Sequence, residues 1–213
     1  MTSRQNFDLY LQPTAFIDSD HPQILDFVND NIAQKKDPKS KAIRLFYAVR
    51  DQILYDPYTF NLKPERLTAS YVRLQKSTFC IPKAILMTAV LRAAGIPARL
   101  GFADLVNHSM GEELKKVLKT NLLAWHGYVE LFLDERWVKA TPAFNAALCQ
   151  RLNVSPVEFD GETHAVFPDT DNNGNRHMEY LRYHGTFSDV PLDMIVESMK
   201  YHYPMLKEHD ELV

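Results

Sequence analysis

Cys80 is the residue whose position in the sequence most favours chemistry. It stands immediately before an almost wholly apolar stretch, Ile81 to Ala94, which predicts a buried helix with Pro82 tolerated in its first turn. The positive end of a helix dipole favours the thiolate, the nucleophilic form of cysteine. Backbone N–H groups at the same helix end could bind a developing oxyanion. Taken alone, such a cysteine is more often a small buried hydrophobic residue.

His126 supplies the proton acceptor that a cysteine nucleophile needs. Ala124 to Leu133 alternates in character and predicts a strand, on which His126 shares the more polar face with Tyr128 and Glu130. From that face an imidazole could reach a thiolate and act as general base and then as general acid. A cysteine that opens a helix, followed 46 residues later by a histidine within a strand, favours nucleophilic catalysis.

The elements that must position these two residues follow from periodicity and from turn residues. Helix start signals at Asp20 and at Asp37-Pro38 precede apolar residues at helical spacing. The predicted elements are helices from about 20, 38, 81, 111, 143 and 191, and strands at 98–103, 124–133 and 136–141. Residues 57–79 look irregular, and the polar stretch Asp169–Arg176 predicts a loop.

Three motifs, in this order, resemble the transglutaminase-like superfamily. The segment from Cys80 to Arg99 resembles the family's nucleophile helix and the Leu-Arg-Ala-x-Gly-Ile-Pro-Ala-Arg run that ends it. His126-Gly-Tyr-Val-Glu is similar to the family's His-x-aromatic-x-Glu strand, and Trp137-Val-Lys-Ala-Thr-Pro is similar to its Trp-Val-x-x-Asp-Pro strand. The resemblance covers about residues 78–142.

This resemblance implies an α+β, papain-like fold in which the nucleophile helix packs on an antiparallel sheet. It implies acyl transfer from amides, with Cys80 as nucleophile, His126 as base, a thioester intermediate and no cofactor. We therefore expect a cysteine hydrolase of the peptidase or amidase type that acts on a peptide or protein amide. The alternatives are a binding module of the same fold that has lost catalysis, and a cross-linking acyltransferase. Hydrolysis is favoured over cross-linking, because nothing in the sequence indicates a cleft that excludes water.

The third family residue is where this sequence departs most. The family's aspartate before proline is Thr141 here, which can orient an imidazole but cannot offset the imidazolium charge. Asn145, four residues on, and Asp104, at the end of the preceding strand, are alternative orienting residues, and the sequence does not choose among the three. Two further departures, Thr78 for a glycine and Tyr128 for a tryptophan, affect the local backbone and the shape of the pocket.

Composition limits the remaining possibilities. The 213 residues are 46% hydrophobic and carry a net charge of −3, which is typical of a globular protein. We expect one domain over 1–213, with an N-terminal helical part (1–77), the catalytic core (78–142) and a C-terminal extension (143–213). No apolar run is long enough to span a membrane, and no basic block indicates nucleic-acid or membrane partners. A cytoplasmic protein is expected, with oligomeric state and substrate identity open.

Several weaker signals are interpreted as structural. Asp169–Asn175 imitates the start of a calcium loop, but position 12 is Tyr180, so an Asx turn is expected and no metal is assigned. Cys149 is expected in the core, and Gln75 is more often a solvated loop residue than an oxyanion donor. The aromatic and histidine residues of the C-terminal part could line a substrate cleft beside Cys80 or simply complete the sheet; they are Phe159, Phe167, Tyr180, Tyr183, His184 and Phe187.

Overall fold

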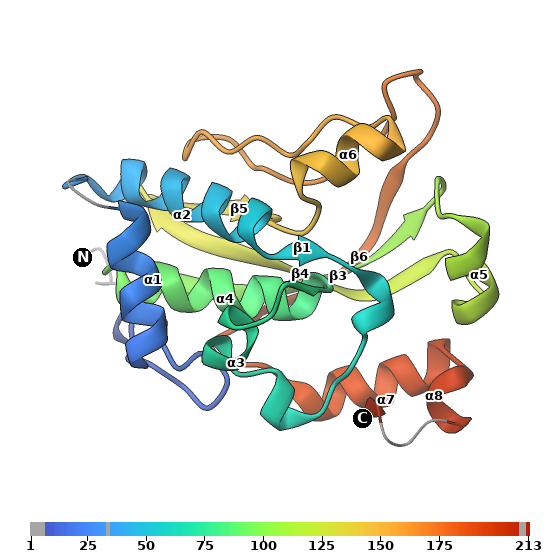
Figure 1. Ribbon diagram of the computed structural model, residues 1–213, viewed down its shortest axis with the longest axis horizontal. Helices are drawn as coiled ribbons and strands as arrows, with labels where there is room; N and C mark the ends of the chain where they lie inside the picture. The colour runs from blue at the N-terminus through green and yellow to red at the C-terminus, as the bar shows by residue number, and fades with distance from the viewer. Residues whose placement is uncertain (1–6, 33–34, 209–211) are drawn as a thin grey trace, which may run out of the picture.

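The computed structural model describes residues 7–32, 35–208 and 212–213. Within these residues the chain forms a four-stranded antiparallel sheet in the order β5-β4-β3-β6 and a two-stranded parallel pair, β1-β2 (Figure 1). The strands are β1 (Leu54–Tyr55), β2 (Ser77–Thr78), β3 (Ala98–Asn107), β4 (Leu122–Leu133), β5 (Arg136–Ala140) and β6 (Met178–Phe187). The helices are α1 (Pro22–Ile32), α2 (Pro38–Gln52), α3 (Ala69–Arg73), α4 (Cys80–Ala93), α5 (Glu112–Leu118), α6 (Ala146–Leu152), α7 (Leu192–His202) and α8 (Met205–Glu208). The predicted α+β class is confirmed.

Helix α4 forms the centre of the molecule. It packs against β4 and β3, while α1, α2 and α3 pack against it in turn (Figure 1). Every residue from Ile81 to Arg92 is buried, as expected for a helix that is apolar on all sides. The Arg92 guanidinium near its end stays satisfied because it donates to three backbone carbonyls, those of Gln12, Ala98 and Ser188.

The two helices predicted in the N-terminal part are confirmed, but the segment after them is more regular than expected. Asp37 caps α2 by accepting the N–H of Ser40 at 2.8 Å. Residues 57–79 include α3 and β2 as well as short 3-10 turns. Strand β2 pairs in parallel with β1, with Tyr55 opposite Thr78, and leads directly into Cys80. This pairing places β1 beside the beginning of α4.

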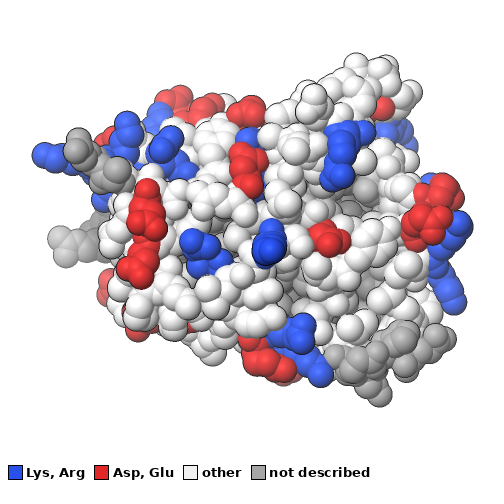
Figure 2. Space-filling view, viewed as in Figure 1, with Lys and Arg blue, Asp and Glu red and all other residues white. Residues whose placement is uncertain are grey.

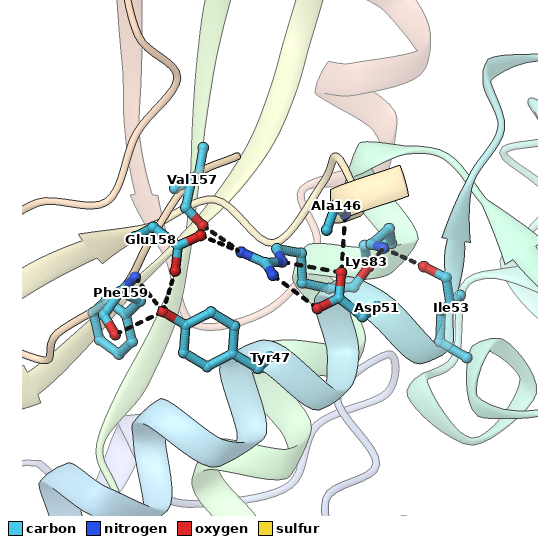
Figure 3. A network of polar contacts seen from close by, with 9 residues as sticks. Tyr47, Asp51, Ile53, Lys83, Ala146, Val157, Glu158 and Phe159 are labelled. Carbon is cyan, nitrogen blue, oxygen red and sulfur yellow. Dashed lines mark hydrogen bonds and ion pairs between the residues drawn. The ribbon is translucent and has the colours of Figure 1, made fainter. Parts of the chain in front are cut away.

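A buried polar network fixes the end of α2 against α4 and α6 (Figure 3). The Lys83 ammonium, on α4, donates to the carbonyls of Arg50 and Ile53, where α2 ends and β1 begins. Asp51 accepts from the Arg50 guanidinium at 2.8 Å and from the N–H of Ala146, the first residue of α6, at 3.0 Å. Burial lowers the pKa of Lys83 to about 7. The network therefore holds β1 in place with a lysine three residues after Cys80.

Strand β6 was not predicted, and its irregular pairing with β3 explains why. Phe102 pairs with Gly185 and Ala103 with Tyr183, so His184 is an extra, bulged residue. On the other side of β3, the register against β4 shifts around Asp104, and Trp125 there has a φ of 54°. Because bulges change which face successive side chains occupy, they remove the period-two signal that identifies a strand in a sequence.

Candidate active site

Cys80 is the first residue of α4, as predicted. The preceding Phe79 supplies no side-chain cap, and Pro82 lies in the first turn, where its missing N–H leaves no carbonyl unpaired. The backbone N–H groups of Ile81 and Gly127 interact with the thiol and lower its pKa, but burial raises it more, to about 11. Desolvation therefore opposes the effect of the helix end, which favours the thiolate.

Gly127 brings β4 into direct contact with the beginning of α4. A Cβ atom at this position would lie 3.0 Å from the Cα of Ile81 and 3.2 Å from the Cβ of Ala84. A side chain at this position would require the helix or the strand to shift by a few tenths of an ångström. Since His126 immediately precedes Gly127, whose N–H interacts with the Cys80 thiol, this close approach brings the backbone of His126 near the sulfur.

His126 is a buried, neutral histidine. It is 2% exposed, and its ring lies 5.2 Å from that of Phe167. Burial lowers the pKa of His126 from 6.5 to about 3. Among the described residues, none forms a hydrogen bond with its Nε2, and no hydrogen bond joins its ring to the Cys80 thiol. The structure thus places the two predicted catalytic residues at neighbouring elements without a hydrogen bond between them.

Thr141 shares the face of the sheet that carries His126. Ala140 pairs with Val129, so the next residue, Thr141, falls opposite Tyr128 and diagonally from His126. Thr141 is fully buried, and within the described chain its Oγ1 has no partner in hydrogen-bond geometry, although the Tyr180 hydroxyl interacts with it. Unpartnered buried polar atoms are uncommon and are found at catalytic sites, among other places.

The two alternative orienting residues are engaged elsewhere. The Asn145 Oδ1 accepts the N–H of Tyr55 at 3.1 Å, which anchors β1. The Asp104 Oδ1 accepts from the N–H of Trp125 at 3.0 Å and from the Nε2 of His184 at 2.8 Å. Of the three candidates, Thr141 is the one whose side chain shares the His126 face, and Tyr180 is the neighbour that interacts with it. Sequence reasoning missed the pair of His184 with Asp104, since 80 residues separate them.

Two cavities with shared walls lie near the beginning of α4. The smaller one, about 170 Å³, contains Cys80 in its wall, and the larger one, about 520 Å³, is lined by residues of α5 and α6 and does not include Cys80. They share the walls formed by Tyr55, Pro57, Tyr58, Leu114 and Leu123. On the face shown in Figure 2, charged side chains of both signs gather at the end formed by α1 and α2 and at the outer end of α5, and a few more lie across the middle of the face.

The C-terminal part contributes to these cavities through other residues than those proposed from the sequence. Met199, Tyr203, Met205 and Leu212 line the smaller cavity. Of the six aromatic and histidine candidates, all described by the structure, none lines either cavity. Those six were chosen by residue type, whereas the C-terminal share of the cavity wall comes from the end of α7 and the segment after it.

Other predicted roles can be placed as well. Gln75 donates to the carbonyl of Tyr71 at 3.1 Å, a local contact at the end of α3. Asp171 accepts the N–H groups of Asn173 and Asn175, which forms the expected Asx turn. Cys149 is buried in the core. In the part of the chain that the structure describes, no cluster of three His, Cys, Asp or Glu residues could hold a metal ion.

Comparison with known proteins agrees with the fold. The family model of the transglutaminase-like superfamily matches residues 26–142, more than half of the chain. The chain therefore belongs to the transglutaminase-like superfamily. No curated protein matches it significantly. A solved structure with 16% identity and a TM-score of 0.48 is that of "a Putative Cysteine Protease from Cytophaga hutchinsonii"; the match covers 84% of this chain and 53% of that one. This chain thus spans about half the length of that structure.

The membership accounts for the arrangement of the elements, and the activity is argued below from the site itself. Within the described residues, no helix is both long and apolar enough to cross a bilayer.

Proposed function

We propose that the protein is a cysteine hydrolase that cleaves an amide bond through a thioester on Cys80. His126 is the general base and acid, and Thr141 is the polar residue beside it. The substrate is a peptide or other amide that enters through the larger cavity and presents its carbonyl carbon to the sulfur. Water, rather than a second amine, resolves the thioester in this proposal.

The reaction balances on these residues. The Cys80 sulfur attacks the carbonyl carbon while its proton passes to the His126 ring, and a tetrahedral oxyanion forms. The carbon–nitrogen bond then breaks, and the amine leaves with the proton from His126. Water attacks the thioester, giving its proton to His126, and the acid leaves as the thiol is restored. The N–H groups of Ile81 and Gly127, which interact with the sulfur, are available to the developing negative charge.

The resting state in this mechanism is a neutral pair. With a thiol pKa of about 11 and an imidazole pKa of about 3, each group resists ionising alone. When a proton moves from sulfur to ring, the two opposite charges form together in a buried site, where their attraction is strong. Hydrogen bonds of catalytic residues commonly tighten only when substrate is bound. The proposal therefore places ionisation in the substrate complex.

The observation that carries the proposal is a pair of buried polar atoms without a partner in hydrogen-bond geometry among the described residues, His126 Nε2 and Thr141 Oγ1, which share one face of the sheet. The backbone N–H of Gly127, the residue after His126, interacts with the Cys80 thiol. Leaving a buried donor or acceptor unpaired costs about 1–3 kcal/mol. A histidine kept at that cost beside a thiol favours proton transfer over packing as its role.

Trapping the acyl-enzyme tests the proposal directly. The protein is incubated with a panel of acyl-aminomethylcoumarin amides, and intact-mass spectrometry is used to detect an adduct on Cys80 that hydroxylamine removes. We expect turnover and the adduct in the wild type and in Cys149→Ala, which removes the other thiol, and neither in Cys80→Ala. Full turnover by Cys80→Ala would refute the mechanism.

A binding module without catalysis is the second candidate, favoured by the replacement of the family's carboxylate with Thr141 and by the protonated resting thiol. Such a module predicts no adduct in the wild type with any amide of the panel, and unchanged ligand affinity in Cys80→Ser. The acylation experiment separates the two candidates.

A further inference from the structure

We propose that the cavity of about 170 Å³ at Cys80 is an acyl subsite that selects an uncharged, aliphatic acyl group of about six carbon atoms. This inference rests on the proposed function, because an acyl chain enters the cavity only if Cys80 attacks the carbonyl to which the chain is attached. It adds the chemical class of the substrate on the acyl side of the bond.

The walls of the cavity come from elements distant in sequence, and all are apolar or aromatic around the sulfur. The loop before α3 and the segment before α4 contribute Phe60 and Phe79, α5 contributes Val117 and Leu118, and α7 contributes Met199. Among the described residues, no Asp, Glu, Lys, Arg or His lines this cavity. Such walls favour a chain that gains from leaving water.

Of the three tyrosine hydroxyls at the cavity wall, that of Tyr203 is already committed to the backbone. The Tyr203 hydroxyl accepts the N–H of Ala124 at 2.7 Å and donates to the carbonyl of Leu122 at 3.2 Å, on the irregular part of β4. Burial raises the pKa of Tyr203, so the hydroxyl stays neutral. A carboxylate at the end of the acyl chain would lose its water in a cavity whose wall, in the described part of the chain, carries no positively charged side chain, which disfavours it.

The sizes of the two cavities indicate which part of the substrate each one binds. An apolar protein cavity of about 150 Å³ accommodates a benzene molecule, so a slightly larger one suits a chain of about six carbons. The larger cavity next to it has polar and charged residues in its wall, including Asp56, Asn107, Ser109 and Arg151. The two cavities share walls, so one substrate can occupy both. The acyl chain fits the smaller cavity, and the leaving amine with the rest of the substrate fits the larger one.

The first test uses esters that share a leaving group and differ in their acyl chain. Acetyl, butyryl, hexanoyl, octanoyl and adipoyl p-nitrophenyl monoesters are compared, and acylation of Cys80 is followed by p-nitrophenolate release and intact mass. The sulfur bonds to the carbonyl carbon, p-nitrophenolate leaves, and the thiol proton passes through His126 to solvent. We expect the acylation rate to rise about fourfold per added methylene up to hexanoyl and then to level off. The adipoyl ester, which ends in a carboxylate, is expected to react at least about tenfold more slowly than the hexanoyl ester.

A variant of the wall provides the second test. Val117 is 42% exposed, so Val117→Asp places a charge at the edge of the cavity without emptying the core. Leu25→Asp is the matched control, because Leu25 is 41% exposed on α1 and lines neither cavity. We expect Val117→Asp to lower the hexanoyl-to-acetyl rate ratio by about tenfold or more, and Leu25→Asp to leave that ratio unchanged.

The outcomes separate the two proposals. Acylation of Cys80 that is independent of chain length, or fastest with the adipoyl ester, overturns the acyl subsite and leaves the proposed function standing. Absence of Cys80 acylation with every ester overturns the proposed function and the subsite with it. If Val117→Asp does not fold, the chain-length series on the wild type still decides.

Discussion

Two histidines on the same sheet have opposite surroundings. The Nε2 of His184, on β6, bonds to the Asp104 carboxylate at 2.8 Å, and its ring stacks on Trp125 with centroids 4.1 Å apart and planes within 8°. His126, the residue after Trp125, is more deeply buried, and among the described residues its Nε2 has no partner. Neither histidine lines either of the two cavities near Cys80. The two differ in that His184 has a carboxylate partner, whereas the Nε2 of His126 has no partner among the described residues.

The difference indicates that the Asp104 carboxylate stabilises the bulged backbone of β4. Asp104 also accepts the N–H of Trp125, the residue whose φ of 54° marks the bulge just before His126. Positive φ is unfavourable for a bulky side chain, and such strain persists only where surrounding contacts hold it. The His184 pair therefore stabilises the backbone that presents His126, while His126 remains available for a proton.

Replacing each ring with phenylalanine should separate these roles most strongly. His126→Phe removes the base, so we expect Cys80 acylation to fall by about a thousandfold, within the range for a lost general base. His184→Phe keeps an aromatic ring against Trp125 and is expected to lower the rate less than about tenfold. Acylation rates with the hexanoyl ester measure both. Equal losses in the two variants would break the distinction between them.

Restoring a carboxylate beside His126 is the next largest expected effect. In Thr141→Asp, a charge would stand on the His126 face and stabilise the imidazolium as it forms, raising the acylation rate by about ten- to a hundredfold. Thr141→Val, which matches the size of threonine without its hydroxyl, is the control and should be no faster than the wild type. A decrease in Thr141→Asp, with the fold intact by circular dichroism, would mean that position 141 does not serve the ring.

How much of this arrangement the sequence predicts depends on the kind of pattern involved. Helix α4, β4 and the order Cys80, His126, Thr141 follow from local periodicity and from the family motifs. The bulged strand β6 and the contact of His184 with Asp104 depend on a register that only the folded sheet defines. Lys83 illustrates the same limit. Its sequence context, an apolar helix, does not indicate that its ammonium group donates to two backbone carbonyls of a segment about 30 residues away.

The free energies of unfolding of His126→Phe and His184→Phe provide a further comparison of the two histidines, with a smaller expected effect. His184→Phe leaves the Asp104 carboxylate without its side-chain partner, and we expect the free energy of unfolding to fall by about 1–3 kcal/mol. In His126→Phe, an apolar ring next to Phe167 takes the place of an imidazole whose Nε2 has no partner among the described residues. We therefore expect the free energy of unfolding to fall by less than in His184→Phe, or to rise. Urea unfolding at pH 7.5 measures both, and a larger loss in His126→Phe would show that His126 has a stabilising partner.

The pH dependence of stability provides the smallest effect and the most specific one. Since the pKa of His126 falls from 6.5 to about 3 on folding, the unfolded chain binds a proton between these values that the folded chain does not. Stability must then decrease as the pH falls from 6.5 towards 3, by at most about 1.4 kcal/mol per pH unit from this group. In His126→Phe this contribution disappears, so the difference in unfolding free energy between wild type and variant should shift in favour of the variant by about 1 kcal/mol from pH 6 to pH 5. A difference that stays constant over this range would mean that His126 takes up its proton as readily in the folded protein as in the unfolded one. The ring would then be solvated or paired, and the neutral resting pair proposed for the active site would be wrong.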